Sequence, residues 1–162
     1  MRYFEDASSA RQTYEQKILN YRDYIYEVTS SIYDETVSSY FDIEIRKKHL
    51  TARPVVFKIT LKGDGGEGMK EVKKNLIDYL LCKYNTLLEF MIQDSACFNG
   101  IDPRQVSGML TEIGKLAQQT SKQVIVSINK YQIGEYKEAI DYIIENSSII
   151  LSEKDKLLKF DF

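Results

Sequence analysis

The sequence predicts an α/β domain in which a long N-terminal helix precedes a mixed sheet with a parallel strand–helix–strand crossover. Three observations support this fold class. Apolar residues recur at helical spacing over residues 8–38, two alternating apolar runs follow, and a helical pattern at 102–122 lies between two short apolar runs. The last arrangement indicates two parallel strands joined by a right-handed crossover through the helix.

Length and composition bound the class of protein. The chain has 162 residues, of which 43% are apolar and 28% charged, as expected for one ordinary globular domain. A formal net charge of −2 argues against a general affinity for nucleic acid or anionic membranes. No apolar run reaches the roughly 18–20 residues of a membrane span, so we expect a cytoplasmic protein without membrane partners. Two cysteines and one histidine are too few for a Cys/His zinc site.

The N-terminal helix is predicted over residues 8–38. Its apolar residues step by four and three positions in turn, and these residues are Tyr14, Ile18, Tyr21, Ile25, Val28 and Ile32. The pattern covers fewer than three clean heptads, which leaves two interpretations open: the end of a coiled coil, or an amphipathic helix packed on a core. We expect a helical arm at residues 1–40 and an α/β body at 41–162.

The body begins with a predicted β-hairpin. In residues 40–48, Phe41 and Ile43 alternate with polar residues, and residues 54–62 give a second strand of the same type. Further on, Met69, Val72, Leu76, Tyr79, Leu80 and Lys83 trace one face of a helix. Residues 86–95 and 123–128 predict strands, the first of them a buried parallel strand. Asp102 and Pro103 are typical of a helix start. A last helix is expected at 134–146, with short strand-like pieces at 148–162.

A glycine-rich loop joins the second strand of the hairpin to the next helix, with glycines at 63, 65, 66 and 68. The spacing from Gly63 to Gly68 fits a phosphate-binding P-loop, but Met69 stands where the lysine is required. Lys70 comes one place late, and Glu71 follows where a hydroxyl would hold Mg²⁺. We therefore reject a P-loop. A glycine-rich connection without a ligand remains one interpretation. The other is a loop whose helix-terminal amides reach a phosphate held by a second subunit.

The strand predicted at residues 86–95 ends in an acid, Asp94. In a nucleotide-binding α/β sheet, a carboxylate at the carboxyl end of a buried strand coordinates Mg²⁺. A carboxylate at this place is also a common capping residue for a turn or helix. Asp102 then starts a helix, and Asn129 directly follows the strand at 123–128.

This order of motifs resembles the second half of an ABC ATPase head, with its signature loop, Walker B acid, D-loop and switch residue. Over about residues 55–162 the chain is similar to the C-terminal lobe of bacterial SMC/RecN-like coiled-coil ATPases. It looks closest to the uncharacterised family domain of unknown function 2326. The specific part of the resemblance is Asp94, Ser95, Asp102, Arg104, Gln105 and Asn129.

The resemblance implies roles for individual residues. Asp94 would be the Walker B acid that holds Mg²⁺, and Asp102 the D-loop acid that contacts the partner lobe. Arg104 and Gln105 would face the dimer from the helix start, and Asn129 would be the switch residue. The nucleotide-binding signature loop would comprise Gly63, Asp64, Gly65, Gly66 and Glu67, of which the last three match the end of an S-G-G-E signature.

The resemblance also implies cofactors and partners. The chain lacks a Walker A motif, so it would bind ATP and Mg²⁺ only with an N-terminal lobe that carries one. It would not be an ATPase on its own, and we expect it to be an excised fragment. A homodimer through the heads or the coiled coil is implied, and work on DNA, in repair or defence, by family analogy. Three departures are Asp64 for the signature serine, Gln93 for a family histidine, and Ser95 for the catalytic glutamate.

The alternative is a non-catalytic interaction module. In that case the helix at 8–38 would pair with a partner protein, and the α/β body would be a degenerate scaffold without nucleotide. The replacements at Asp64 and Ser95 favour it. A free-standing hydrolase is weakly supported, because His49 is the only histidine and the chain has no Ser/His/Asp set.

Overall fold

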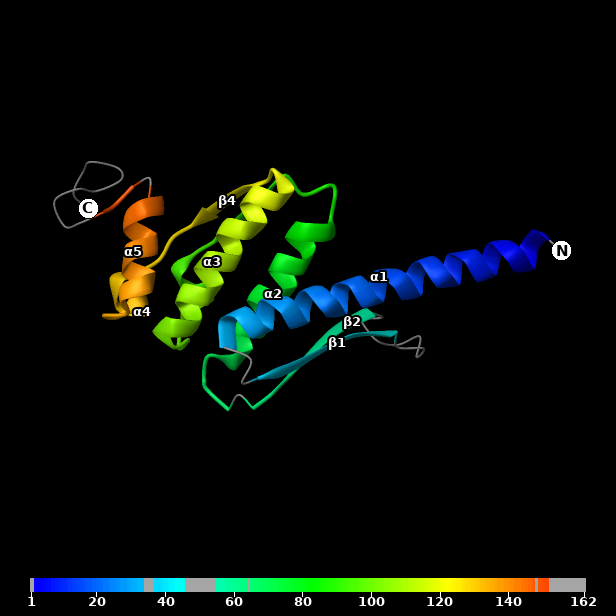
Figure 1. Ribbon diagram of the computed structural model, residues 1–162, viewed down its shortest axis with the longest axis horizontal. Helices are drawn as coiled ribbons and strands as arrows, with labels where there is room; N and C mark the ends of the chain where they lie inside the picture. Colours follow the sequence, from blue (N-terminus) through cyan, green and yellow to red (C-terminus); the bar gives the residue numbers. More distant parts are fainter. Residues whose placement is uncertain (1, 34–36, 46–54, 64, 148, 152–162) are drawn as a thin grey trace.

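The computed structural model describes residues 2–33, 37–45, 55–63, 65–147 and 149–151 (Figure 1). Within these residues the chain forms five α-helices, a short 3₁₀ helix and two separate two-stranded sheets, one antiparallel and one parallel. A mixed α/β composition and a parallel pair are thus confirmed. The expected single mixed sheet is wrong for the described residues, because the hairpin and the parallel pair share no hydrogen-bonded strands.

The N-terminal helix, α1, spans Arg2–Tyr33, and its side chains are described from Thr13 onward. The helix starts before residue 8, its predicted first residue. It ends before residue 38, its predicted last residue, because β1 begins there. Ile25, Val28 and Ile32 are fully buried, whereas Tyr14 is 48% exposed. The apolar stripe therefore packs on the core in its C-terminal half, as in an amphipathic helix, while Figure 1 shows the N-terminal part projecting beyond the body.

The predicted hairpin is confirmed. Strands β1 (Ser38–Ile45) and β2 (Val55–Lys62) pair antiparallel, with Phe41 opposite Ile59. Phe41 is fully buried against the core, as the alternation of the strand predicts. Arg22 of α1 fastens the hairpin to the helix, since its Nε donates to the Phe41 carbonyl oxygen at 2.9 Å.

Two helices form the centre of the body, α2 (Met69–Tyr84) and α3 (Pro103–Thr120). Their apolar faces share one core with α1, and its largest fully buried apolar residues include Leu76, Tyr79, Met109 and Leu116. Close approach of α1 to α3 depends on Gly108, because a β-carbon there would lie 3.0 Å from the Ile32 Cα. Ser31 also donates to the buried Glu112 carboxylate at 2.8 Å. The two helices are thus joined by apolar and polar contacts.

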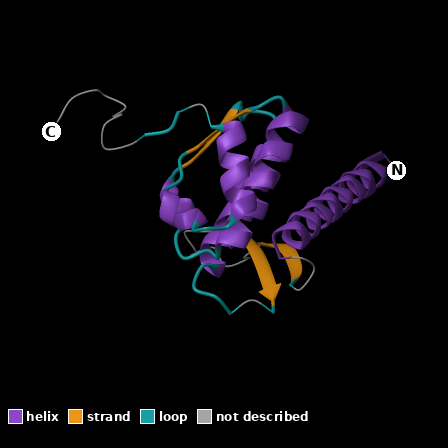
Figure 2. Cartoon of the chain, turned by 60° about the vertical axis from the view of Figure 1, so that its left-hand side comes forward, coloured by secondary structure: helices purple, strands orange, loops and turns teal. Residues whose placement is uncertain are grey.

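The parallel pair consists of β3 (Phe90–Gln93) and β4 (Gln123–Val126), linked by α3 as predicted. One face of the pair packs on the core and includes the fully buried Gln93. The opposite face, which we call the outer face, carries Phe90, Ile92, Gln123 and Ile125, and its three apolar side chains are 59%, 62% and 45% exposed. The prediction of a buried strand is therefore wrong for β3, because its helices cover a single face. In Figure 2 the pair lies at the edge of the molecule, with the central helices to one side.

The C-terminal part differs from the expected single helix at 134–146. A short helix, α4 (Lys130–Ile133), comes first, and α5 (Lys137–Asn146) follows it. Gly134 separates them with a φ of 53°, a backbone conformation that glycine adopts without strain. Tyr142 of α5 packs over Gly114 of α3. Residues 149–151 form no regular strand, and the rest of the predicted strand-like pieces, residues 148 and 152–162, lies outside the described residues.

Candidate functional site at the carboxyl ends of the parallel strands

The carboxyl ends of β3 and β4 bring Asp94 and Asn129 to the same edge of the parallel pair. Gln93 and Val126 are register partners, and the Ser127 amide donates to the Gln93 carbonyl oxygen at 2.9 Å. Asp94 leaves β3 at this point, and Asn129 follows two residues after Ser127. The edge where ligands bind in open α/β sheets is thus the one that carries both predicted residues.

Asp94 is exposed and begins a short 3₁₀ helix, η1 (Ser95–Phe98), that the sequence analysis did not predict. Its Oδ1 accepts a hydrogen bond from the Ala96 amide at 2.9 Å, and the Cys97 thiol lies 3.8 Å from the same oxygen. Asp94 therefore caps η1, which is one of the two roles expected for this residue. Among the described residues neither contact engages Oδ2, so one carboxylate oxygen can still bind a ligand.

The Asp102 carboxylate caps α3. It accepts hydrogen bonds from the Arg104 amide at 2.9 Å and from Arg104 Nε at 3.1 Å, and Pro103 occupies the first helical turn, as predicted. These bonds, the backbone one first, lower the pKa of the Asp102 carboxyl group. Gln105 is half-buried on the first turn of the same helix. The three predicted D-loop and dimer-facing residues therefore share one helix start.

The described part of the glycine loop comprises Gly63 and residues 65–68; Asp64 lies outside the described residues. Gly63 has a φ of 101°, which favours glycine. Gly65, Gly66 and Glu67 are exposed. Gly68 is the N-cap residue of α2 and provides no side-chain cap, and it lies so close to Gly100 that a β-carbon would overlap the Gly100 carbonyl oxygen. The glycine loop therefore contacts the loop that leads into Asp102.

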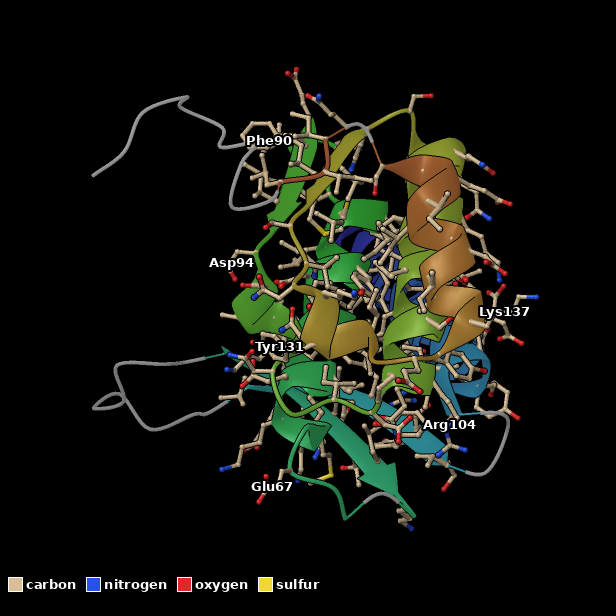
Figure 3. The ribbon with its side chains drawn as sticks, turned by 90° about the vertical axis from the view of Figure 1, so that its left-hand side faces the viewer. Glu67, Phe90, Asp94, Arg104, Tyr131 and Lys137 are labelled. Carbon is tan, nitrogen blue, oxygen red and sulfur yellow. The ribbon has the colours of Figure 1, made fainter. Side chains whose placement is uncertain are left out.

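Asn129 precedes α4, and this short helix is tied to the turn after Asp94. The Asn129 amide donates to Gln132 Oε1 at 2.9 Å, and Gln132 Nε2 donates to the Ser95 carbonyl oxygen and to Asn99 Oδ1. The Tyr131 hydroxyl also donates to Asn99 Oδ1, at 3.3 Å, although its ring is 71% exposed. Figure 3 shows Asp94, Tyr131 and Glu67 along one side of the molecule, with Arg104 across from them.

Three polar side chains are buried beneath this site, and two of them, Asn75 and Gln132, were not predicted from the sequence. Asn75, Gln93 and Gln132 are 2%, 1% and 4% exposed. One signal for Asn75 was present in the sequence, because it lies three residues after Val72 and so on the apolar face of the predicted helix. Gln132 carried no comparable signal, since its burial depends on a tertiary contact with the turn after Asp94.

The site offers limited metal-binding chemistry by itself. In the part of the chain that is described, no three His, Cys, Asp or Glu side chains gather as a metal-ligand group. Mg²⁺, however, keeps several waters and needs only one or two carboxylates when a nucleotide supplies phosphate oxygens. Asp94 alone can therefore supply the protein ligand for such an ion, provided that other groups hold the phosphates.

None of the described helices is long and apolar enough to cross a membrane. A comparison with curated proteins and one with solved structures each found no match. A family model described as an uncharacterised protein conserved in bacteria, domain of unknown function 2326 (DUF2326), matches residues 28–162. Because this match covers most of the sequence, the chain belongs to the DUF2326 family.

Proposed function

We propose that this chain is the C-terminal half of an SMC/RecN-like ABC ATPase head, which contributes the signature loop, the Walker B acid and the D-loop. ATP and Mg²⁺ would bind only together with a lobe that carries Walker A. The observation that carries the proposal is the parallel pair, which presents Asp94 and Asn129 at its carboxyl edge while its outer face stays apolar and exposed.

The exposed outer face supports the idea of a missing lobe. Parallel sheets occur almost only with both faces covered by helices, and a two-stranded parallel sheet with one bare face is an incomplete unit. Ile92 and Ile125 are 62% and 45% exposed on that face. Further parallel strands with a covering helix would bury them. A strand added beside β4 would also deliver its own carboxyl end, and any phosphate-binding loop there, to the edge that holds Asp94 and Asn129.

The contacts between the predicted motifs also support the proposal. The glycine loop meets the Asp102 loop through Gly68 and Gly100, and the Asp94 turn meets the Asn129 turn through Gln132. A nucleotide in this head would be held by Walker A of the missing lobe. Asp94 would then help to hold Mg²⁺, and the exposed glycine-loop residues 65–67, which precede α2, would meet the γ-phosphate of a nucleotide on a second head.

The residues fit ATP and Mg²⁺ only in part. Asp94 suits a magnesium ligand, but Ser95 stands where a glutamate would activate water, and no G-x4-G-K-[ST] motif exists in the chain. The proposed role is therefore nucleotide binding shared between lobes. Hydrolysis would require a base from another part of the head.

Helix α1 would connect ATP binding to a coiled-coil arm. It packs on α3 through Ile32 against Gly108 and through the Ser31–Glu112 hydrogen bond, and Asp102 caps the start of α3. A rigid movement of α1 would therefore move the D-loop with it. Dimerisation through the heads or the arm, a role in DNA repair or defence, and a cytoplasmic location follow from the ABC-type resemblance and belong to the same proposal.

The experiment is ATP binding and hydrolysis by this chain together with the Walker A lobe, whether that lobe belongs to the same polypeptide or to a separate one, and we call this assembly the complete protein; both activities are measured with and without Mg²⁺. Asp94→Asn removes the metal ligand and still accepts a hydrogen bond from the Ala96 amide. We expect it to weaken Mg²⁺-dependent ATP binding by at least about tenfold, because a charged metal ligand contributes more than one neutral hydrogen bond.

Asp141→Asn, on the exposed surface of α5, is the matched control and should bind ATP like the wild type. The isolated 162-residue chain should bind ATP only weakly, since it lacks Walker A. If the complete protein binds no ATP, or if Asp94→Asn and Asp141→Asn bind it equally, the ATPase proposal is wrong and an interaction module becomes the better explanation.

A further inference from the structure

Two buried side-chain amides hold the turn that follows Asp94. Asn75 reaches it from α2, where Nδ2 donates to the Cys97 carbonyl oxygen at 2.7 Å. Gln132 reaches it from α4, where Nε2 donates to the Ser95 carbonyl oxygen at 2.5 Å. Asn75 and Gln132 are 2% and 4% exposed, so both bonds are shielded from water. Turn η1 is thus held by two elements that are distant in sequence.

The oxygen atom of each amide binds a second partner. Asn75 Oδ1 accepts a hydrogen bond from Gln93 Nε2 at 2.6 Å, at the end of β3 directly before Asp94. Gln132 Oε1 accepts one from the Asn129 amide at 2.9 Å. The Asn75 amide therefore links α2, the helix that follows the glycine loop, to the residues on both sides of Asp94. The Gln132 amide links the turn at Asn129 to η1.

These bonds connect the residues on both sides of Asp94 to the rest of the molecule. The carboxylate itself bonds to the Ala96 amide, which belongs to the same turn, and this local bond does not fix its position relative to the sheet or the helices. The backbone before Asp94 is held by the pairing of β3 with β4, and the turn after it is held by the two amides. A buried amide that loses its partner is costly, so the two amides favour one arrangement of the turn strongly over others.

We propose that Asn75 and Gln132 are positioning residues that together place the Asp94 carboxylate, so that its position depends on both α2 and the turn at Asn129. The inference rests on the proposed function for the identity of the ligand that Asp94 binds. How the turn is held follows from the hydrogen bonds and does not depend on that function. A ligand that displaces the start of α2, or a partner that displaces Asn129, would shift Asp94 through these amides. The glycine loop, Asp94 and Asn129 would then change position together.

The test compares Asn75→Leu and Gln132→Met, which keep the approximate volume of each side chain and remove its hydrogen bonds. Thr120→Val is the control, because it keeps the approximate volume of the side chain and removes the hydrogen bond from Thr120 to the Leu116 carbonyl oxygen, which lies at the C-terminal end of α3 and does not involve the turn. Backbone amide hydrogen exchange is measured on the complete protein under native conditions. Both amide variants should exchange about tenfold faster over residues 95–99, as expected for the loss of a buried hydrogen bond, and Thr120→Val should not.

Unchanged exchange over residues 95–99, or the same acceleration in Thr120→Val, would overturn the positioning role. The second measurement is the Mg²⁺ concentration needed for half-maximal ATP binding, which should rise several-fold in both amide variants and stay constant in the control. Faster exchange with an unchanged Mg²⁺ requirement would also overturn the inference, because Asp94 would then be placed by other contacts. If the complete protein binds no ATP, the proposed function fails, and the exchange measurement still decides how the turn is held.

Discussion

Gly68 and Gly100 lie against each other, backbone to backbone, so that the start of α2 contacts the loop leading into α3. A β-carbon at position 68 would overlap the Gly100 carbonyl oxygen, and backbone atoms cannot rotate away as a side chain can. This contact joins two of the motifs that the sequence analysis treated separately, and it holds the glycine loop beside Asp102.

Gly68→Ala should therefore destabilise the protein, although its φ of −71° suits alanine. Overpacking against backbone costs about 1–3 kcal/mol, and we expect a loss of unfolding free energy in that range. Urea denaturation followed by circular dichroism measures it. Gly65→Ala is the matched control, since a β-carbon there meets nothing within 4 Å. Equal stability of the two variants would contradict the close contact.

The packing of α5 on α3 gives a second prediction. A β-carbon at Gly114 would overlap the Tyr142 hydroxyl, a single atom that phenylalanine lacks. We expect Gly114→Ala to be destabilising in the wild type and less so, or stabilising, in a Tyr142→Phe background. In that background the helix propensity of alanine, about 1 kcal/mol better than glycine, is no longer opposed by a clash.

A double-mutant cycle of thermal unfolding measures this coupling between positions 114 and 142. A favourable interaction energy of about 1 kcal/mol is expected for the double variant, in line with neighbours that share a contact. Additive effects of the two substitutions would show that Tyr142 can move aside without cost.

The Asp102 cap predicts a pH dependence. Hydrogen bonds from Arg104 lower the pKa of Asp102 from its ordinary value of 3.8, so the charged form is favoured in the folded state. The contribution of the Asp102 carboxylate to the unfolding free energy is therefore fully present above the ordinary pKa of 3.8. It is lost as the pH falls from about 4 through the lower pKa of the folded state. At pH 7, Asp102→Ala should cost about 1 kcal/mol through loss of the cap.

The difference in unfolding free energy between the wild type and Asp102→Ala should stay constant from pH 7 to pH 5 and shrink below about pH 4. Asp102→Asn keeps a capping oxygen without a titratable group, and its stability relative to Asp102→Ala should not change over the same range. Chemical denaturation at each pH provides the measurement. A difference that grows toward acid would contradict the lowered pKa.

The outer face of the parallel pair predicts the effects of a polar substitution. Ile92 is 62% exposed on that face, so Ile92→Gln should change the unfolding free energy of the isolated chain by no more than about 0.5 kcal/mol. The substitution should still reduce binding of a hydrophobic dye and self-association, because it divides an exposed apolar patch. Dye fluorescence and sedimentation velocity measure the two effects. Ile113→Gln in the core should instead unfold the chain.

Local patterns in the sequence were sufficient for most of the secondary structure. The alternation around Phe41 gave the hairpin, and Asp102 with Pro103 gave the start of α3, because β-strand alternation and helix capping involve only neighbouring residues. The parallel pairing of β3 with β4 was also predicted, since two strands joined by one helix have few alternatives. Family membership followed from a short cluster of residues around Asp94 and Asp102.

What only the tertiary structure decided depends on residues that are distant in sequence. An apolar strand such as β3 looks buried in the sequence, but which of its faces is covered depends on where the helices pack, and Ile92 lies on the uncovered one. Asn75 and Gln132 have no sequence motif, since a buried amide is useful only where a distant backbone carbonyl oxygen meets it. The sequence by itself therefore determined which residues would gather at one edge of the parallel strands, and the packing of α2 and α4 decided how they are held there.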